Sequence, residues 1–187
     1  MAIIDKTTGK SVTYSRALIG ALILSSKFSR YDKGFIGIMI PTSAGAALAT
    51  TGALMSGRVP VMINYSTGAE ANVRYAQKKC RFTTVITSRS LLEKINCPLV
   101  EGMVMIEDIM AGVTTGDKLK AALKTKLPLG LLLKSISGGS EDGMAAMLFT
   151  SGSEKDPKAV PLTHRNLIAN IESFSNYVGI SGEDTLL

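Results

Sequence analysis

The sequence predicts an α/β fold, with a mainly parallel sheet of about five strands flanked by helices. Short apolar segments alternate along the chain with longer amphipathic segments, a pattern typical of a parallel sheet covered by helices. The 187 residues are 45% hydrophobic and 19% charged, which favours one compact domain over intrinsic disorder. Two cysteines and one histidine, at the spacing found here, exclude a disulfide framework and a structural zinc site.

Five segments are predicted to be strands, because each is short and apolar on both faces, as a strand between two helical layers must be. They are residues 35–40, 59–63, 83–87, 103–106 and 145–149. Pro60 is expected at the beginning of its strand, where a missing N–H group costs least.

Helical spacing of apolar residues predicts the helices. The predicted segments are residues 15–27, 44–56, 69–79, 90–94, 118–126 and 165–177. The last has the clearest pattern, with Thr163 as a plausible N-cap and Gly179 placed to end the helix.

The uncharged run 34–57 is long enough to span a membrane. Its proline, glycines and hydroxyl residues favour a buried strand followed by a buried helix instead. No apolar segment of signal-peptide length follows the first charges, so a cytoplasmic protein is expected.

The stretch from Thr150 to Lys158 carries the most chemistry. Thr150, Ser151 and Ser153 supply hydroxyl groups, Gly152 frees backbone N–H groups, and Lys158 adds a positive charge. These groups suit phosphate oxygens, and the loop follows the end of a predicted strand, where open α/β sheets bind ligands. No glycine precedes Lys158 directly and no Ser or Thr follows it, which excludes the common nucleotide-hydrolase loop. The alternative is a polar loop that only joins the strand to a following helix.

The same stretch resembles the phosphate-loop signature of the adenylate-forming (AMP-binding) enzymes, the acyl-CoA synthetase and luciferase superfamily. The resemblance rests on residues 149–153, 157–158 and 163–167. Residues 37–41, 57–61 and 85–88 are similar to the first three sheet strands of that superfamily. The nearest branch is the bacterial acyl-[acyl-carrier-protein] synthetases, including those fused to 2-acylglycerophosphoethanolamine acyltransferase, which residues 64–68, 87–89, 113–115 and 151–154 resemble.

This resemblance implies an enzyme that activates a fatty acid with ATP, accompanied by Mg²⁺, and releases pyrophosphate. The acyl group would pass to the phosphopantetheine thiol of acyl carrier protein or CoA. For this chain it implies that residues 150–153 cradle the β- and γ-phosphates and that Lys158 neutralises them. Residues 1–187 would be the N-terminal portion of the AMP-binding domain, with the catalytic residues expected beyond Leu187. That portion is expected to be inactive alone, and the alternative is a non-catalytic nucleotide- or partner-binding module with the same fold.

The loop departs from the superfamily at three positions. Glu154 stands where Thr is usual, and Lys155 and Ala159 stand where Gly is usual. A carboxylate near phosphates is unfavourable unless it is paired, and Lys155 is a candidate partner for Glu154. A lysine adopts a positive φ less easily than glycine does.

Lysines gather between Lys118 and Lys134. Three interpretations stay open: a solvated helix face, a patch that contacts the inner membrane surface, or a docking site for an acidic carrier protein. Nucleic-acid binding is not expected, because the net charge of +6 is spread along the chain and only 5% of residues are aromatic. His164 is expected to act in capping or at the surface rather than in proton transfer, and Cys80 to be a buried apolar residue.

Overall fold

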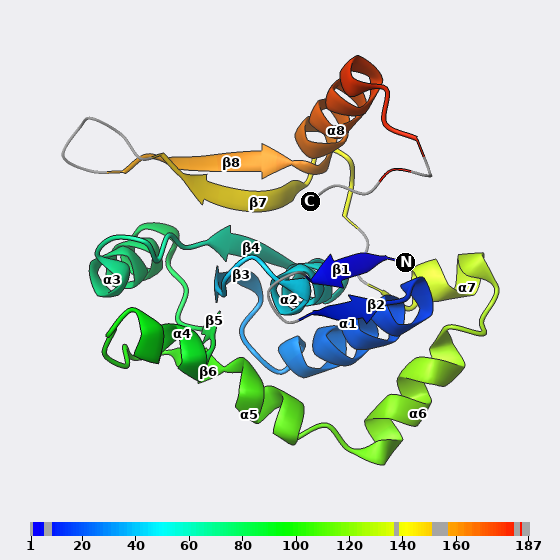
Figure 1. Ribbon diagram of the computed structural model, residues 1–187, viewed down its shortest axis with the longest axis horizontal. Coiled ribbons are helices and arrows are strands. Elements are labelled where there is room, and N and C mark those ends of the chain that lie inside the picture. The colour runs from blue at the N-terminus through cyan, green and yellow to red at the C-terminus, as the bar shows by residue number, and fades with distance from the viewer. Residues whose placement is uncertain (1, 6–8, 137–138, 151–156, 182–183, 185–187) are drawn as a thin grey trace.

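A six-stranded sheet forms the centre of the computed structural model, which describes residues 2–5, 9–136, 139–150, 157–181 and 184 (Figure 1). The strand order is β6-β5-β3-β4-β7-β8, and every neighbouring pair is parallel except β7 with β8. The strands are β3 (Gly34–Met39), β4 (Arg58–Met62), β5 (Val85–Thr87), β6 (Met103–Met105), β7 (Met144–Phe149) and β8 (Ala159–Thr163). A separate antiparallel pair consists of β1 (Ile3–Asp5) and β2 (Lys10–Val12). The predicted α/β class and mainly parallel sheet are confirmed, while β1, β2 and β8 were not predicted.

Helices connect the strands. They are α1 (Tyr14–Phe28), α2 (Ala44–Met55), α3 (Ala69–Cys80), α4 (Arg89–Lys94), α5 (Ile106–Ala111), α6 (Thr115–Lys124), α7 (Leu129–Lys134) and α8 (His164–Val178). All six predicted helices are confirmed with small shifts at their ends, and α5 and α7 are additional. The uncharged run therefore forms β3 and α2, as predicted. Among the helices the structure describes, none is both long enough and apolar enough to cross a membrane.

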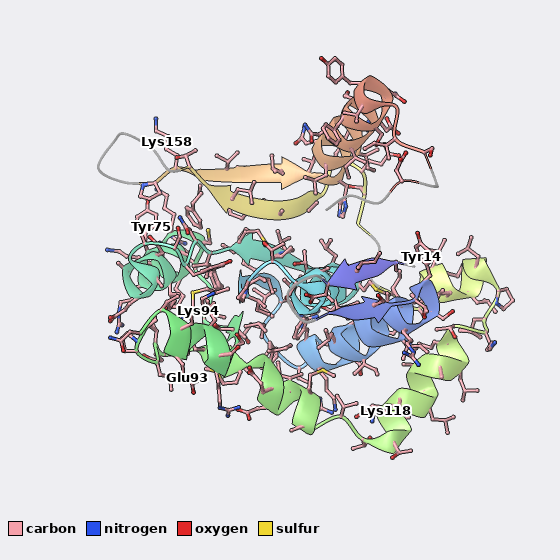
Figure 2. All side chains as sticks on the ribbon, viewed as in Figure 1. Tyr14, Tyr75, Glu93, Lys94, Lys118 and Lys158 are labelled. Carbon is pink, nitrogen blue, oxygen red and sulfur yellow. The ribbon has the colours of Figure 1, made fainter. Side chains whose placement is uncertain are left out.

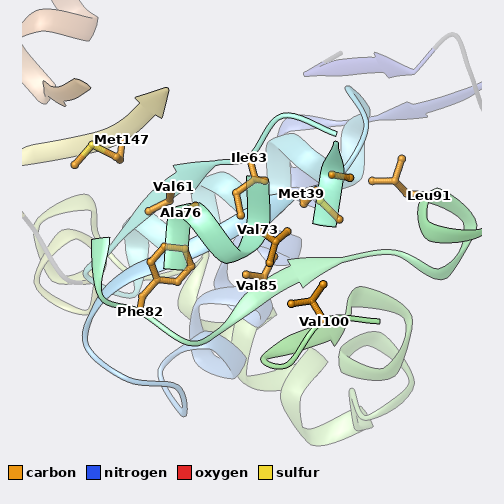
Figure 3. Close-up of a cluster of buried hydrophobic side chains, with 11 residues drawn as sticks. Met39, Val61, Ile63, Val73, Ala76, Phe82, Val85, Leu91, Val100 and Met147 are labelled. Carbon is orange, nitrogen blue, oxygen red and sulfur yellow. The ribbon is translucent and has the colours of Figure 1, made fainter. Parts of the chain in front are cut away.

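Two apolar clusters cover the two faces of the sheet. On one face, Val73 and Ala76 of α3 and Leu91 of α4 pack against strand residues such as Val61 and Val85 (Figure 3). On the other face, residues of α1, α2 and α5 pack against the remaining strand side chains; this cluster includes Leu24, Phe28, Ala49, Ala53, Ile109, Ile36, Ile38 and Ile86. Consecutive strand residues point to opposite faces, so both faces of the parallel strands are buried.

Small residues allow α1 and α2 to pack closely. A Cβ atom added to Gly52 would lie 2.7 Å from the Cβ atom of Leu24 and 3.3 Å from the carbonyl oxygen of Ala21. These distances leave no room for a side chain, because the neighbouring atoms belong to the α1 backbone or are directly attached to it. The Ala- and Gly-rich composition of α2 is therefore explained by its contact with α1.

A buried lysine attaches α6 to α1. The Lys27 ammonium group donates to Asp117 at 2.7 Å and to the carbonyl oxygen of Gly112 at 2.9 Å. Asp117 also completes a capping box with Thr114 at the beginning of α6. The Lys27 ammonium group and the two Thr114 hydrogen bonds hold the pKa of Asp117 far below its ordinary value of 3.8. The carboxylate therefore both caps α6 and neutralises a buried charge.

A second buried cation, Arg58, fastens β4 to the turn between α1 and β3. Its guanidinium group donates to the carbonyl oxygens of Ser56, Ser29 and Tyr31. Two chain segments, the end of α2 and the turn after α1, thus supply acceptors to one side chain, whose planar fork of donors suits several acceptors at once.

The β7, β8 and α8 elements form the upper layer in Figure 1. The pairing of β4 with β7 has a single pair of Cα partners, Val61 and Met147. Pro60, which lies beside Val61, is the third residue of β4, so the prediction that it lies at the beginning of the strand was wrong.

The apolar stripe of α8 stays exposed, and it includes Ile168, Ile171, Phe174 and Val178. The described residues thus leave this helix face uncovered.

We predict that Gly52→Ala destabilises the protein, because the added methyl group must push α1 away from α2. The expected loss is about 2 kcal/mol in the free energy of unfolding, measured by denaturant titration. Gly45→Ala in the same helix is the matched control, since its Cβ atom would meet only the Ser43 hydroxyl at 3.6 Å. The control should be neutral or slightly stabilising, and equal losses in both variants would contradict the packing argument.

We predict that Asp117→Asn lowers the melting temperature at neutral pH, because it leaves the buried Lys27 charge without its carboxylate. Since the folded pKa of Asp117 is depressed, its contribution is present above the ordinary pKa of 3.8 and is lost as the pH falls further. The melting temperatures of wild type and variant should therefore converge in acid. Asp108→Asn, which removes the exposed partner of Arg89, is the control and should change stability little. A constant difference between wild type and Asp117→Asn down to acid pH would contradict a stabilising role of the Asp117 charge.

Candidate functional site

The candidate site lies at the carboxyl edge of the sheet. Val61 of β4 is opposite Met147 of the parallel strand β7. Three residues further along each strand, Asn64 and Thr150 follow the strand ends, so both lie at the same edge. Open α/β sheets bind ligands at this edge.

Two reciprocal hydrogen bonds close the base of the predicted phosphate loop. The Thr150 amide donates to the carbonyl oxygen of Lys158 at 3.0 Å, and the Lys158 amide donates to Thr150 Oγ1 at 3.1 Å. A threonine hydroxyl that accepts one bond still has a proton to donate. The structure thus brings Thr150 and Lys158 together and leaves the Thr150 hydroxyl able to donate toward a ligand.

The other predicted ligands are outside the described residues. Ser151, Gly152 and Ser153 fall in this part of the chain, as do Glu154 and Lys155. Their roles, including a pairing of Glu154 with Lys155, stay predictions.

The loop is the tip of a β-hairpin, which corrects the predicted order of strand, loop and helix. After Lys158 the chain enters β8, which pairs antiparallel with β7, and α8 begins only at His164. Pro161 lies within β8 and is tolerated there because β8 is an edge strand, where a missing N–H group costs little. The hairpin holds Lys158 beside the strand that precedes the loop, rather than at a helix N-terminus.

Thr163, at the start of α8, has the capping role predicted for it. Thr163 is the N-cap and forms a capping box with Asn166. The His164 amide donates to the carbonyl oxygen of Gly143 at 3.1 Å. His164 therefore takes part in the junction of α8 with the hairpin.

Tyr75 is a site residue that the sequence did not indicate. Its hydroxyl group donates to the carbonyl oxygen of Pro157 at 2.7 Å, and its ring meets the ring of Phe149 edge-on with centroids 5.8 Å apart. Figure 2 shows Tyr75 and Lys158 at the same end of the molecule. Tyr75 precedes Pro157 by 82 residues, and its place between Arg74 and Ala76 in α3 gives no sign of this contact. The loop is thus tethered to the sheet layer by a side chain of α3.

A turn held by side-chain hydrogen bonds follows β4. Asn64 Oδ1 accepts from the amide and the hydroxyl group of Ser66, while the Asn72 side chain donates to the carbonyl oxygens of Asn64 and Thr67. Gly68 then adopts a left-handed conformation, with φ of +61°, before α3 begins. These contacts fix the path of the chain at the carboxyl end of β4.

A cavity of about 520 Å³ opens between this turn, the first turns of α3 and residues 95–98. Glu70 and Arg74, which pair at 3.0 Å, line it together with Cys97. Burial, and to a smaller extent Glu70, raise the pKa of the Cys97 thiol. Burial also raises the pKa of the Cys80 thiol. Cys80 lies at the end of α3 and is half-buried, whereas the sequence predicted a buried apolar residue. Neither thiol is activated as a nucleophile.

Side chains that ligate metals do not gather in the described part of the chain. There, no group of three or more His, Cys, Asp and Glu residues is arranged to hold a metal ion.

Comparison with known sequences gives both a family and partial relatives. A family profile described as "AMP-binding enzyme" matches residues 1–187. A chloroplastic long-chain-fatty-acid–[acyl-carrier-protein] ligase of Arabidopsis thaliana is 46% identical over 46 residues, covering 25% of this chain and 6% of the relative. A hybrid PKS-NRPS synthetase of Fusarium sp. (strain FN080326) is 35% identical over 89 residues, covering 42% of this chain and 2% of the relative. This chain thus spans only a small part of either relative.

Solved structures share the fold. The o-succinylbenzoate coenzyme A synthetase of Bacillus subtilis in complex with AMP has a TM-score of 0.70 at 16% identity, covering 94% of this chain and 42% of that one. McyG A-PCP complexed with phenylalanyl-adenylate has a TM-score of 0.69 at 16% identity, covering 94% of this chain and 27% of that one. The fold is that of the N-terminal domain of adenylate-forming ligases. With a family profile that matches its whole length, this chain belongs to the AMP-binding enzyme family.

Proposed function

We propose that this chain is the N-terminal portion of an ATP-dependent ligase that forms acyl-adenylates from fatty acids. The observation that carries the proposal is the closed base of the loop, where Thr150 and Lys158 exchange hydrogen bonds at the carboxyl edge of a parallel sheet. Family membership supports the same function. The alternative, a non-catalytic nucleotide- or partner-binding module, keeps the loop but lacks the reaction.

In the proposed reaction, a fatty carboxylate oxygen attacks the α-phosphorus of ATP. A new P–O bond forms, the bond between the α-phosphorus and the bridging oxygen breaks, and pyrophosphate leaves with the electron pair. A phosphopantetheine thiol then attacks the acyl carbonyl and AMP leaves, which gives a thioester. The charge on the leaving pyrophosphate increases in the first step, so cationic and N–H groups around it lower the barrier.

Thr150, Ser151, Gly152 and Ser153 are proposed to surround the β- and γ-phosphates, with Lys158 as the neutralising charge. The hairpin supports this assignment, because it holds the Lys158 backbone within hydrogen-bonding distance of Thr150. Tyr75 is proposed to position the loop through Pro157 without touching the nucleotide. Mg²⁺ would accompany ATP, and we assign it no ligand from this chain.

Carrier proteins are the acceptors we favour. The plant relative that shares 46% identity over 46 residues is named as a ligase acting on an acyl carrier protein. CoA remains the competing acceptor, since a coenzyme A synthetase is among the structural neighbours. Comparing acyl transfer to acyl carrier protein and to CoA in the gene product that contains this chain tests this choice.

The rest of the ligase is proposed to lie C-terminal to this chain. The chain covers less than half of the solved structures named above. The exposed apolar stripe of α8 offers a surface for such a further part to cover. The catalytic residues are assigned to that part, and residues 1–187 alone are proposed to be inactive.

The proposal predicts that the gene product containing this chain exchanges labelled pyrophosphate into ATP when a fatty acid is present. Lys158→Ala should weaken ATP binding and slow the exchange by about tenfold or more, because a charged hydrogen-bond donor is lost. Lys79→Ala, which removes an exposed lysine of α3, is the matched control and should leave both unchanged. ATP binding without exchange would favour the non-catalytic module, and undiminished ATP binding in Lys158→Ala would contradict the loop assignment.

Tyr75→Phe is predicted to weaken ATP binding by about fivefold, the equivalent of one neutral hydrogen bond, while the contact with Phe149 and the melting temperature are retained. Calorimetric titration with ATP measures the first effect and thermal unfolding the second. Tyr177→Phe serves as the control, because Tyr177 is fully solvated at the end of α8. An unchanged affinity in Tyr75→Phe would show that the tether has no role in binding.

A further inference from the structure

The segment formed by α6, the following turn and α7, residues 115–136, exposes leucines and lysines together. Its exposed leucines are Leu119, Leu123, Leu127, Leu129, Leu131 and Leu133, each between 39% and 69% accessible to solvent. Its lysines, all exposed, are Lys118, Lys120, Lys124, Lys126 and Lys134. We call these eleven side chains the leucine–lysine surface. A solvated helix face, one of the three interpretations left open by the sequence, does not explain so many exposed leucines in one segment.

The leucines of α6 lie on the side of the helix that faces away from the protein. Ala121 is buried against Leu22 and Ile23 of α1, and the Lys27–Asp117 pair fixes the same side. Leu119 and Leu123 are one helical turn apart and lie opposite Ala121. Lys118 and Lys120 follow on either side of this leucine stripe. The apolar stripe is therefore outside the core and bordered by positive charge.

The α7 helix repeats this arrangement. Leu132 and Ile136 pack against the cluster that contains Leu22, Ile23 and Ala121, and so hold the helix to α1. None of the α7 residues is buried. Leu129, Leu131 and Leu133 remain exposed, and the helix ends at Lys134.

The leucine–lysine surface is separate from the candidate site. Figure 2 shows Lys118 and Lys158 at opposite ends of the molecule, and Figure 1 shows α6 and α7 at the end away from α3. An occupant of this surface would therefore leave the loop at 150–158 accessible.

The charge of the segment is one-sided. After Asp117, which is paired with Lys27, the sequence has no acidic residue until Glu141 and has five lysines. The five lysines therefore attract an anionic partner, and no unpaired acidic residue of the segment repels it. Apolar side chains bordered by lysines are typical of helices that lie at the boundary between lipid headgroups and acyl chains. Lysines are depleted in protein–protein interfaces, which favours a lipid surface over an acidic protein.

We propose that the leucine–lysine surface docks this protein on an anionic phospholipid surface, with the leucines inserted among the acyl chains and the lysines at the headgroups. The contact is peripheral and reversible. It combines two contributions: about tenfold in affinity for each fully inserted leucine and about fivefold for each lysine near the charged surface. Salt screens the second contribution only.

Flotation of the full chain with lipid vesicles tests the proposal. The protein should float with vesicles of equimolar phosphatidylcholine and phosphatidylglycerol, and at least tenfold less with phosphatidylcholine alone. The double substitution Leu119→Ser and Leu123→Ser should reduce binding at least tenfold without changing the melting temperature, because neither side chain contributes to the core. The triple substitution Lys118→Gln, Lys126→Gln and Lys134→Gln should reduce vesicle binding by a similar factor. The remaining binding should depend little on salt concentration.

Matched controls distinguish binding by the leucine–lysine surface from nonspecific adsorption to the vesicles. Leu99→Ser removes an equally exposed leucine elsewhere, and the pair Lys78→Gln and Lys79→Gln removes two exposed lysines of α3. Both controls should float like the wild type. Three results would overturn the proposal: no flotation with anionic vesicles, flotation that survives the leucine substitutions, or binding to an acidic carrier protein in the absence of vesicle binding. A dimer that is lost in the leucine variant, with no vesicle binding, would assign the surface to a second copy of the chain and overturn it as well.

Discussion

The parallel pairing of β4 with β7 is the constraint on which the candidate site depends. It joins the hairpin and α8 to the rest of the sheet through one pair of Cα partners, Val61 and Met147. Because the strands are parallel, the pairing brings the loop after β7 to the edge where β4 also ends. Tyr75 adds a second attachment at the far end of the hairpin, so the loop base is held from two sides.

Covering both faces of the sheet requires two different kinds of helix packing. On one face, α3 and α4 pack with branched side chains, including Val73 and Leu91. On the other, α2 presents alanine and glycine, and Gly52 lets α1 approach until no side chain fits between the backbones. Tight contact between α1 and α2 in turn supports Leu22 and Ile23, which hold α6 and α7.

Most of the central fold could be predicted because its elements have periodic patterns. The five parallel strands are apolar on both faces, and α8 has helical spacing with Thr163 as a true N-cap. The helices α5 and α7 have only six residues each, too few for a clear period, although α4 of the same length was predicted; a proline within β8 is unusual for a strand. In the site, Thr150 and Lys158 follow from local sequence, whereas Tyr75 reaches Pro157 across 82 residues through a contact that only the folded chain creates.

Two buried cations lie near the end of α1, and different groups neutralise their charges. This difference determines which of the two contacts acid weakens first. Lys27 relies on a carboxylate that protons can discharge. Arg58 relies on three peptide carbonyl groups, which do not titrate. Strong acid, well below pH 3.8, should therefore weaken the contact of α6 with α1 first, while the turn held by Arg58 keeps its shape. The attachment of α6 is thereby sensitive to protons, whereas the hydrogen bonds of Arg58 are not.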